Sequence, residues 1–204
     1  MAVAEDLVWV SPSLLFWQAY DACCRTEVSS CAHIIDGEIY LVDPIELSPG
    51  AIEELSLVAT PEMILLTNGN HARAALRFKE RFKIPIFAHQ DAREDLEIAL
   101  DGFVDENSPI FYDCHIIPLT GAGRGEIAIY QAGSGVLSIG DALINLPGSG
   151  FCPLPKKYCE DSKELRKSLG KLASIRVGAI TFAHGIPIIS DAGERLLQVI
   201  SNKI

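Results

Sequence analysis

The chain has 204 residues, of which 17 are basic and 27 are acidic, so its formal net charge at pH 7 is −10. This length favours a single domain over residues 1–204, and a composition with 49% hydrophobic and 22% charged residues excludes an intrinsically disordered chain. The acidic balance excludes nucleic acid as the main partner, because phosphate binding needs a basic surface. No apolar run approaches the ~18 residues that span a bilayer, so we expect no membrane partner.

The N-terminal region and the cysteines indicate a cytoplasmic protein. Glu5 and Asp6 precede the first basic residue, Arg25, so we expect no secretory leader with a positively charged start. The six cysteines include no Cys-x-x-Cys pair, which excludes a zinc ribbon or a thioredoxin-type site. We therefore expect reduced thiols. The sequence leaves open whether the chain forms a homo-oligomer.

The first half of the chain alternates between strand-like and helix-like apolar patterns. A turn at Asp36-Gly37 joins two of the predicted strands as a hairpin. Ser48 and Pro49 predict the start of a helix, and Asp91-x-x-Glu94 is a capping box that predicts another. The predicted strands are 14–17, 31–35, 38–42, 63–67 and 85–89, and a further helix is predicted over about 71–82.

The second half continues the alternation without a linker. Asp161-x-x-Glu164 and Asp191-x-x-Glu194 each predict a helix start. Residues 145–157 are rich in proline and glycine and are predicted to be one long loop. The predicted strands are 110–119, 126–131, 136–139 and 179–183. Mixed strands and helices of this kind predict one α/β domain with covered sheets.

Polar residues follow three of these strands, at the point where each strand ends. The segment from Thr67 to Arg73 follows 64–66, Gly140 and Asp141 follow 136–139, and His184 and Gly185 follow 180–183. Binding and catalytic sites of layered α/β folds gather at the carboxyl ends of strands. The functional residues are therefore expected among these three segments.

At this point the sequence resembles the metallo-β-lactamase-fold hydrolases. The resemblance rests on five blocks in the family's order, within roughly residues 30–190: 36–43, 64–67, 125–130, 137–143 and 183–185. It implies a four-layer αββα sandwich, in which two mixed sheets face each other between outer helices. It also implies that Asp141 and His184 stand at ligand positions of the family's zinc site, and that the loop 145–157 lies beside the mouth of that site.

The chain departs from the family at most other ligand positions. The family motif His-x-His-x-Asp-His falls on Asn68, Asn70, Ala72 and Arg73, and the histidine of its Pro-Gly-His motif falls on Ala122. Alanine and arginine do not ligate divalent metals. The standard binuclear zinc site is therefore predicted to be lost, which leaves at most one metal ion.

His71 offers a substitute ligand, one position beyond Asn70. With Asp141 and His184 it makes a set of two histidines and one carboxylate, which suits a single zinc or ferrous iron ion. Such an ion lowers the pKa of a bound water to about 7. On this interpretation the chain is a hydrolase of a small ester- or thioester-like substrate. Its substrate-binding residues are Asn68, Asn70 and Arg73, which contact the anionic part.

Two other interpretations use the same residues without a metal. In the first, Asn68, Asn70, His71 and Arg73 surround a helix N-terminus and bind a small anionic ligand, so that the chain is a non-catalytic pseudoenzyme of the same fold. In the second, the two asparagines are structural caps, Arg73 pairs with an acid, and Asp141 and His184 hydrogen-bond each other.

Overall fold

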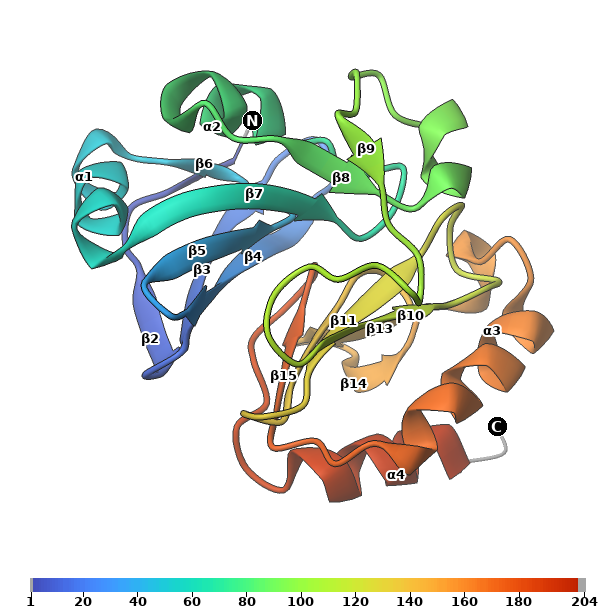
Figure 1. Ribbon diagram of the computed structural model, residues 1–204. Helices are drawn as coiled ribbons and strands as arrows, with labels where there is room; N and C mark the ends of the chain where they lie inside the picture. The colour runs from blue at the N-terminus through green and yellow to red at the C-terminus, as the bar shows by residue number, and fades with distance from the viewer. Residues whose placement is uncertain (1, 202–204) are drawn as a thin grey trace.

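Residues 2–201, the part of the chain that the computed structural model describes, form two β-sheets that face each other, with four α-helices outside them (Figure 1). The larger sheet contains, in spatial order, β2 (Val8–Ser11), β3 (Leu14–Asp21), β4 (Thr26–Ile35), β5 (Glu38–Val42), β7 (Thr60–Leu66), β8 (Ile86–Ala88) and β9 (Gly102–Phe103). The smaller sheet contains β10 (Cys114–Pro118), β11 (Ile127–Gln131), β12 (Val136–Ile139) and β15 (Ala179–Phe182). Two short pairs complete the strands: β1 (Val3–Ala4) with β6 (Glu46–Leu47), and β13 (Leu143–Leu146) with β14 (Gly150–Pro153).

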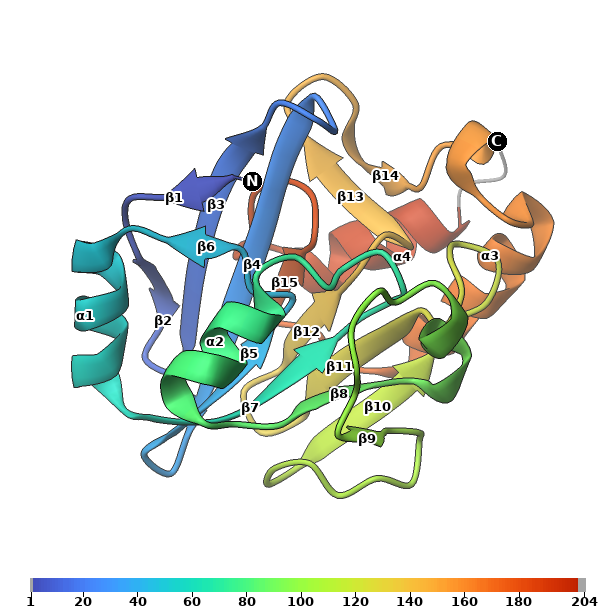
Figure 2. The same ribbon diagram turned by 90° about the horizontal axis from the view of Figure 1, so that it is seen from above.

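The helices lie on the two outer faces of this pair of sheets (Figures 1 and 2). The larger sheet is covered by α1 (Pro49–Val58) and α2 (Ala75–Phe82), and the smaller one by α3 (Ser162–Leu169) and α4 (Ala192–Ser201). Three apolar clusters fill the three interfaces between the four layers. They are represented by Phe78 of α2 on the larger sheet, Leu65 and Ile129 between the sheets, and Leu169 of α3 on the smaller sheet. The predicted αββα sandwich is confirmed.

Local signals account for several element boundaries. Asp36 and Gly37 both have positive φ, 52° and 87°, as the tight hairpin turn between β4 and β5 requires. The Ser48 side chain accepts a hydrogen bond from the N–H of Ala51 at the start of α1, and the Asp161 side chain accepts two at the start of α3. These boundaries agree with the predicted ones.

Several predicted elements differ from the structure; the strand predicted over 110–119, for example, begins only at Cys114, and three further differences lie near the site. Residues 145–157 are not one loop, because the hairpin of β13 and β14 occupies most of the segment and only its tip, 147–149, is a turn. The capping box at Asp91 does not start an α-helix; His89 caps a short 3-10 helix, Gln90–Glu94, instead. The helix predicted from His71 begins only at Ala75, because Arg73 has a φ of 38°, outside the helical region.

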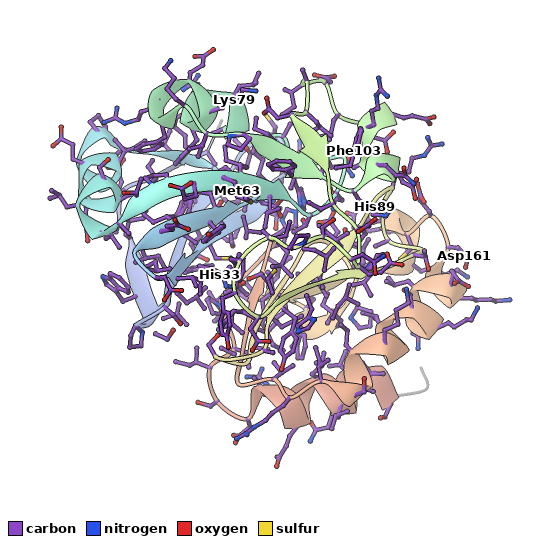
Figure 3. The ribbon with its side chains drawn as sticks, viewed as in Figure 1. His33, Met63, Lys79, His89, Phe103 and Asp161 are labelled. Atoms are coloured by element: carbon purple, nitrogen blue, oxygen red, sulfur yellow. The ribbon has the colours of Figure 1, made fainter. Side chains whose placement is uncertain are left out.

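His33 is a structural residue between the sheets, as the apolar strand around it suggests (Figure 3). It is 1% exposed, and its Nε2 lies 2.8 Å from the hydroxyl of Ser138 on the facing sheet. Burial lowers the pKa of His33 to about 4, so the ring is neutral at pH 7.

All six cysteines are free. In the described part of the chain, no helix is both long and apolar enough to cross a membrane.

Candidate metal centre

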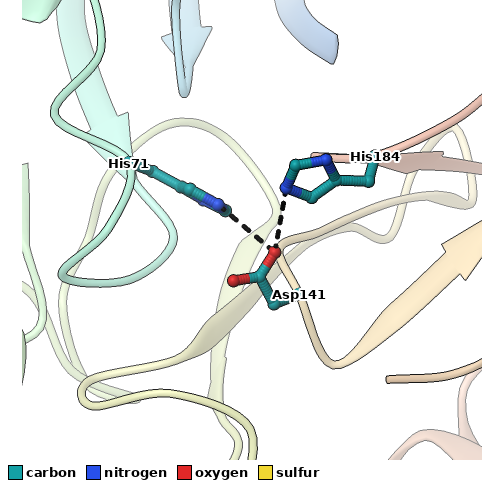
Figure 4. A group of neighbouring side chains, drawn as sticks. All are labelled: His71, Asp141 and His184. Carbon is teal, nitrogen blue, oxygen red and sulfur yellow. Dashed lines mark ion pairs between the residues drawn. The ribbon is translucent and has the colours of Figure 1, made fainter. Parts of the chain in front are cut away.

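The fold brings the three predicted ligands together (Figure 4). Strands β12 and β15 are parallel with Ile139 beside Phe182, so Asp141 and His184, each two residues further on, leave the same edge of the sheet together. The Nε2 atoms of His71 and His184 each lie 3.3 Å from Oδ1 of Asp141. All three candidate ligand atoms lie within 4.8 Å of one another.

The two separations at Asp141 fit one small metal ion. A tetrahedral zinc ion with bonds of about 2.0–2.1 Å places its ligand atoms about 3.3 Å apart. The two nitrogen–oxygen distances at Asp141 are 3.3 Å, which is long for a hydrogen bond between nitrogen and oxygen. The donor set of two imidazoles and one carboxylate also matches what zinc and ferrous iron prefer.

Each histidine is held by its other ring nitrogen. Nδ1 of His71 lies 2.9 Å from Oδ2 of Asp43 and 2.8 Å from the hydroxyl of Thr67. Nδ1 of His184 lies 2.9 Å from the backbone carbonyl oxygen of Glu27. With Nδ1 occupied in this way, the Nε2 atom of each ring faces Asp141 and becomes the metal-binding atom once it carries no proton, which is how metal-binding histidines are usually oriented.

Asp43 ends the family-like block 36–43 but is not among the predicted site residues, and the structure places it against His71. It follows β5 directly and is 2% exposed. Its carboxylate accepts hydrogen bonds from both the N–H (2.8 Å) and the hydroxyl (2.5 Å) of Thr67. The only signal in the sequence is an acidic residue directly after an apolar strand. Its pairing with His71 depends on β5 and β7 being neighbours in the sheet.

The charges of this cluster are strongly coupled. Burial alone would lower the pKa of His71, but the carboxylates of Asp43 and Asp141 outweigh it and raise that pKa to about 9. Burial would raise the pKa of Asp141, but His71 and His184 outweigh it and hold that pKa well below its usual value. Without a metal ion, His71 is therefore an imidazolium between two carboxylates at pH 7.

The backbone around His184 is tightly packed. Gly185 has a φ of 109°, and a Cβ there would lie 2.0 Å from the carbonyl oxygen of Asn145. The N–H of Asn145 donates to the carbonyl of His184 (3.1 Å), and the N–H of Ile186 donates to the carbonyl of Asn145 (3.2 Å). Strand β13 is therefore joined, close to the turn of the β13–β14 hairpin, to the segment that carries the ligand.

Asn68 supports Asp141 from behind. It is fully buried, and its Nδ2 donates to Oε2 of Glu126 (2.7 Å) and to Oδ2 of Asp141 (3.1 Å). Its Oδ1 accepts a hydrogen bond from the N–H of Asn70 (2.8 Å). Because Asn68 is buried and its amide atoms already have protein partners, the predicted contact between Asn68 and a substrate is replaced by a structural one.

The carboxyl group of Glu126 beside Asn68 is also buried. Burial, reinforced by the charge of Asp141, raises the pKa of Glu126 to about 8.

Comparison with known proteins identifies the family. The model of the metallo-β-lactamase superfamily matches residues 8–203. The chain belongs to the metallo-β-lactamase superfamily. That places it among hydrolases that typically bind zinc. No curated protein sequence is similar enough to this superfamily member to count as a relative.

Solved structures show the same fold at low sequence identity. VMB-1 superimposes with a TM-score of 0.76 at 12% identity, over 98% of this chain and 97% of its own. The metallo-β-lactamase DIM-1 has a TM-score of 0.75 at 13% identity, covering 97% of this chain and 98% of its own. The metallo-β-lactamase FIM-1 from Pseudomonas aeruginosa, in its mono-zinc form, has a TM-score of 0.75 at 13% identity, with 95% and 93% covered.

Arg73 has a different role from the one predicted for this superfamily member. Its guanidinium donates to the backbone carbonyls of Ser29 (2.6 Å), Asp43 (3.2 Å) and Ala183 (3.1 Å). These carbonyls belong to segments that carry or support the candidate ligands, so Arg73 joins both sheets beneath the site. The predicted contact with an anionic substrate is replaced by this structural one.

We expect Arg73→Lys to lower the free energy of unfolding by roughly 2 kcal/mol, because one ammonium group cannot reach three carbonyls that a planar fork reaches. Urea denaturation of the variant and the parent measures this. Unchanged stability together with a raised KM for an anionic substrate would instead assign Arg73 to substrate binding.

The anion site predicted at the helix N-terminus is not available. The N–H groups of His71, Ala74 and Ala75 already donate to the backbone carbonyls of Asn68, Pro44 and Ala72, respectively. An anion at this position would have to displace these bonds. The described structure therefore argues against this form of the metal-free interpretation.

A pocket of about 1000 Å³ opens beside Asp141 and His184. One wall is the tip of the β3–β4 hairpin and the other is the β13–β14 hairpin, so the segment 145–157 lies at the mouth of the site. Apolar side chains of the second hairpin, Ile144 and Leu146, are among its lining residues. Asn70, the remaining predicted substrate contact, is exposed and lines the pocket.

Proposed function

We propose that this superfamily member is a hydrolase that holds a single zinc or ferrous ion on His71, Asp141 and His184 and cleaves a small ester- or thioester-like substrate. The observation that carries this proposal is the convergence of two imidazoles, each held at Nδ1, on one oxygen of Asp141. The contacts at Nδ1 point both Nε2 atoms at the same oxygen, which is the arrangement that one shared ion requires.

A single ion fits the chain better than two. The family's other ligand positions carry Asn68, whose amide is bound to two carboxylates, and Ala72 and Ala122, which have no donor atom. Arg73 stands at a further ligand position of the family motif, and its guanidinium adds a positive charge near Asp43 and Asp141. These residues support one ion and oppose a second.

A bound ion would polarise a carbonyl group and lower the pKa of a coordinated water to about 7. Asp43 and the Glu27 carbonyl hold the two imidazoles in place during the reaction. The amide of Asn70, exposed at the pocket wall, can donate a hydrogen bond to the substrate's carbonyl oxygen. Ile144 and Leu146 cover the apolar part of the substrate and keep water from it.

The pocket rim favours a substrate with an anionic group. Arg25 lines the pocket from the tip of the β3–β4 hairpin, and Lys157 lines it from the short 3-10 helix after β14. Both are exposed and belong to no ion pair that the described residues show; the Lys157 ammonium lies 4.5 Å from the centre of the Tyr158 ring. Arg124 is different, because it pairs with Glu94 and with Glu160. We therefore assign the anionic part of the substrate to Arg25 and Lys157.

Elemental analysis of the purified protein tests the metal. After supplementation we expect about one zinc or iron ion per chain, and well below one in His184→Ala. Hydrolysis of paired acyl esters, one with and one without a terminal carboxylate, tests the substrate. Arg25→Ala is expected to raise KM about tenfold for the carboxylate ester alone.

Three results would contradict the proposal. Contents of zinc, iron and manganese that all lie far below one ion per chain would show that the protein does not hold the proposed metal ion. Stoichiometric metal without hydrolysis of any ester or thioester would leave the non-catalytic anion-binding alternative. An equal effect of Arg25→Ala on both esters would remove the assignment of the anionic group.

A further inference from the structure

Glu126 is a buried carboxyl group that no step of the proposed reaction uses. It lies just before β11, is 1% exposed, and none of the family's ligand motifs falls on it. Its Oε1 accepts a hydrogen bond from the N–H of Ala142 (2.9 Å), and its Oε2 accepts one from Nδ2 of Asn68 (2.7 Å). Both contacts lead directly to Asp141, one through the backbone and one through a side chain.

The first route fixes the backbone of Asp141. Ala142 is the next residue along the chain, so its N–H belongs to the same peptide unit as the Asp141 carbonyl. On the other side of Asp141, a Cβ at Gly140 would lie 2.7 Å from Oε1 of Glu126 and 2.4 Å from the hydroxyl of Thr67. The chain thus packs directly on the Glu126 carboxyl group on both sides of Asp141.

The second route fixes the carboxylate of Asp141. The N–H of Asn70 donates to Oδ1 of Asn68, which sets the orientation of the amide. Nδ2 of Asn68 therefore faces the carboxyl groups, and its two hydrogens are shared between Glu126 and Oδ2 of Asp141. With Oδ2 held in this way, Oδ1 faces the two imidazoles.

We propose that Glu126 is a positioning residue that sets the direction of the Asp141 carboxylate, through Asn68 on one side and the Ala142 N–H on the other. Asn68 stands where the family has a histidine ligand, so this chain uses that position to support a ligand. The proposal rests on the proposed metal function for its chemical purpose, but the positioning itself is a property of the metal-free protein and is testable there.

Glu126→Gln separates positioning from simple filling of space. Glutamine has nearly the same volume but only one acceptor oxygen, so it can accept from Ala142 or from Asn68 but not from both. We expect the affinity for Co²⁺ and Zn²⁺, measured by competition with a chromophoric chelator, to fall about 10- to 100-fold. The visible absorption of the Co²⁺ form is expected to change, because the ligand geometry changes.

A further measurement, on the metal-free protein, accompanies the affinity and absorption measurements. In the metal-free variant, the ¹⁵N resonances of Nε2 of His71 and His184 are expected to shift, because their shared acceptor has moved. Glu53→Gln, the same substitution at an exposed position on α1, is the matched control and is expected to leave affinity, spectrum and resonances unchanged. A purely structural role for Glu126 would lower the melting temperature without moving these signals.

Asn68→Ala provides a second, independent variant. It breaks only the side-chain route, and because Glu126 and Asn68 act on the same carboxylate, the two changes together should cost less than the sum of their separate effects. If Glu126→Gln does not fold, the same measurements on Asn68→Ala decide the question.

Folded variants with parental imidazole resonances, and with parental Co²⁺ affinity and spectrum, would overturn the positioning role while leaving the proposed metal function intact. A parent protein that takes up no metal would overturn the metal function, and the imidazole resonances of the metal-free variants would still confirm or overturn the positioning role.

Discussion

His71→Ala is expected to abolish metal binding and to lower the free energy of unfolding of the metal-free protein by about 3 kcal/mol. His71 is 2% exposed and pairs with Asp43, which is equally buried. Removal of the imidazole leaves the Asp43 carboxylate buried without its positive partner. The two hydrogen bonds from Thr67 remain, which keeps the loss at the lower end of the range for a broken buried pair.

His184→Ala is the matched comparison. Its side chain is 19% exposed, and its Nδ1 contacts a backbone carbonyl and not a buried charge. We expect this variant to lose metal equally but to lose less than about 1 kcal/mol of stability. Urea denaturation of both chelator-treated variants, with elemental analysis, provides the measurement. Equal stability of the two would show that the His71–Asp43 pair does not stabilise the fold.

Metal affinity is expected to rise about tenfold for each pH unit between pH 7 and 9. The pKa of His71 in the metal-free protein is raised to about 9, and ligation requires the neutral ring. Below pH 9 the ion must therefore displace a proton, and above it the competition ends. The same raised pKa stabilises the metal-free fold fully below the unfolded value of 6.5, and this stabilisation is lost as pH rises through 9.

Titration calorimetry of Zn²⁺ in buffers with different ionisation enthalpies counts the released protons at pH 7. We expect at least one, from His71. Glu126, whose pKa is about 8, releases a second proton if the positive charge of the bound ion favours its carboxylate form. No proton release, or an affinity that does not change between pH 7 and 9, would mean that the ion does not bind at His71.

The parts of the fold that the sequence predicts well have local causes. The Asp36-Gly37 turn, the Ser48 cap and the Asp161 cap each depend on residues within four positions of one another. The late start of α2 has no local cause. Arg73 donates to carbonyls that are distant in sequence, and these contacts hold its backbone outside the helical region. The β13–β14 hairpin was equally hard to predict, because prolines and glycines mask its short strands.

The same division applies to the site. Asp141 and His184 could be proposed because they follow strands in the family's order, and His71 because it lies beside a lost ligand position. Asp43 and Glu126 could not, because their contacts cross between elements that only the folded sheets bring together. The donors of Asn68 and Arg73 were assigned to a substrate for the same reason, since nothing local shows that other protein groups already occupy them.

The backbone hydrogen bonds between Asn145 and the segment that carries His184 divide the β13–β14 hairpin into two parts that differ in how well they tolerate insertions and substitutions. Its first strand, β13, shares backbone hydrogen bonds with a candidate ligand through Asn145, so an insertion in that strand is expected to shift the imidazole of His184. Its tip, 147–149, is exposed, lines the pocket and touches none of the candidate ligands in the described hydrogen-bond network. Under the proposed hydrolase function, variants altered only at the tip are therefore expected to change their substrate range while the three candidate ligands keep their positions.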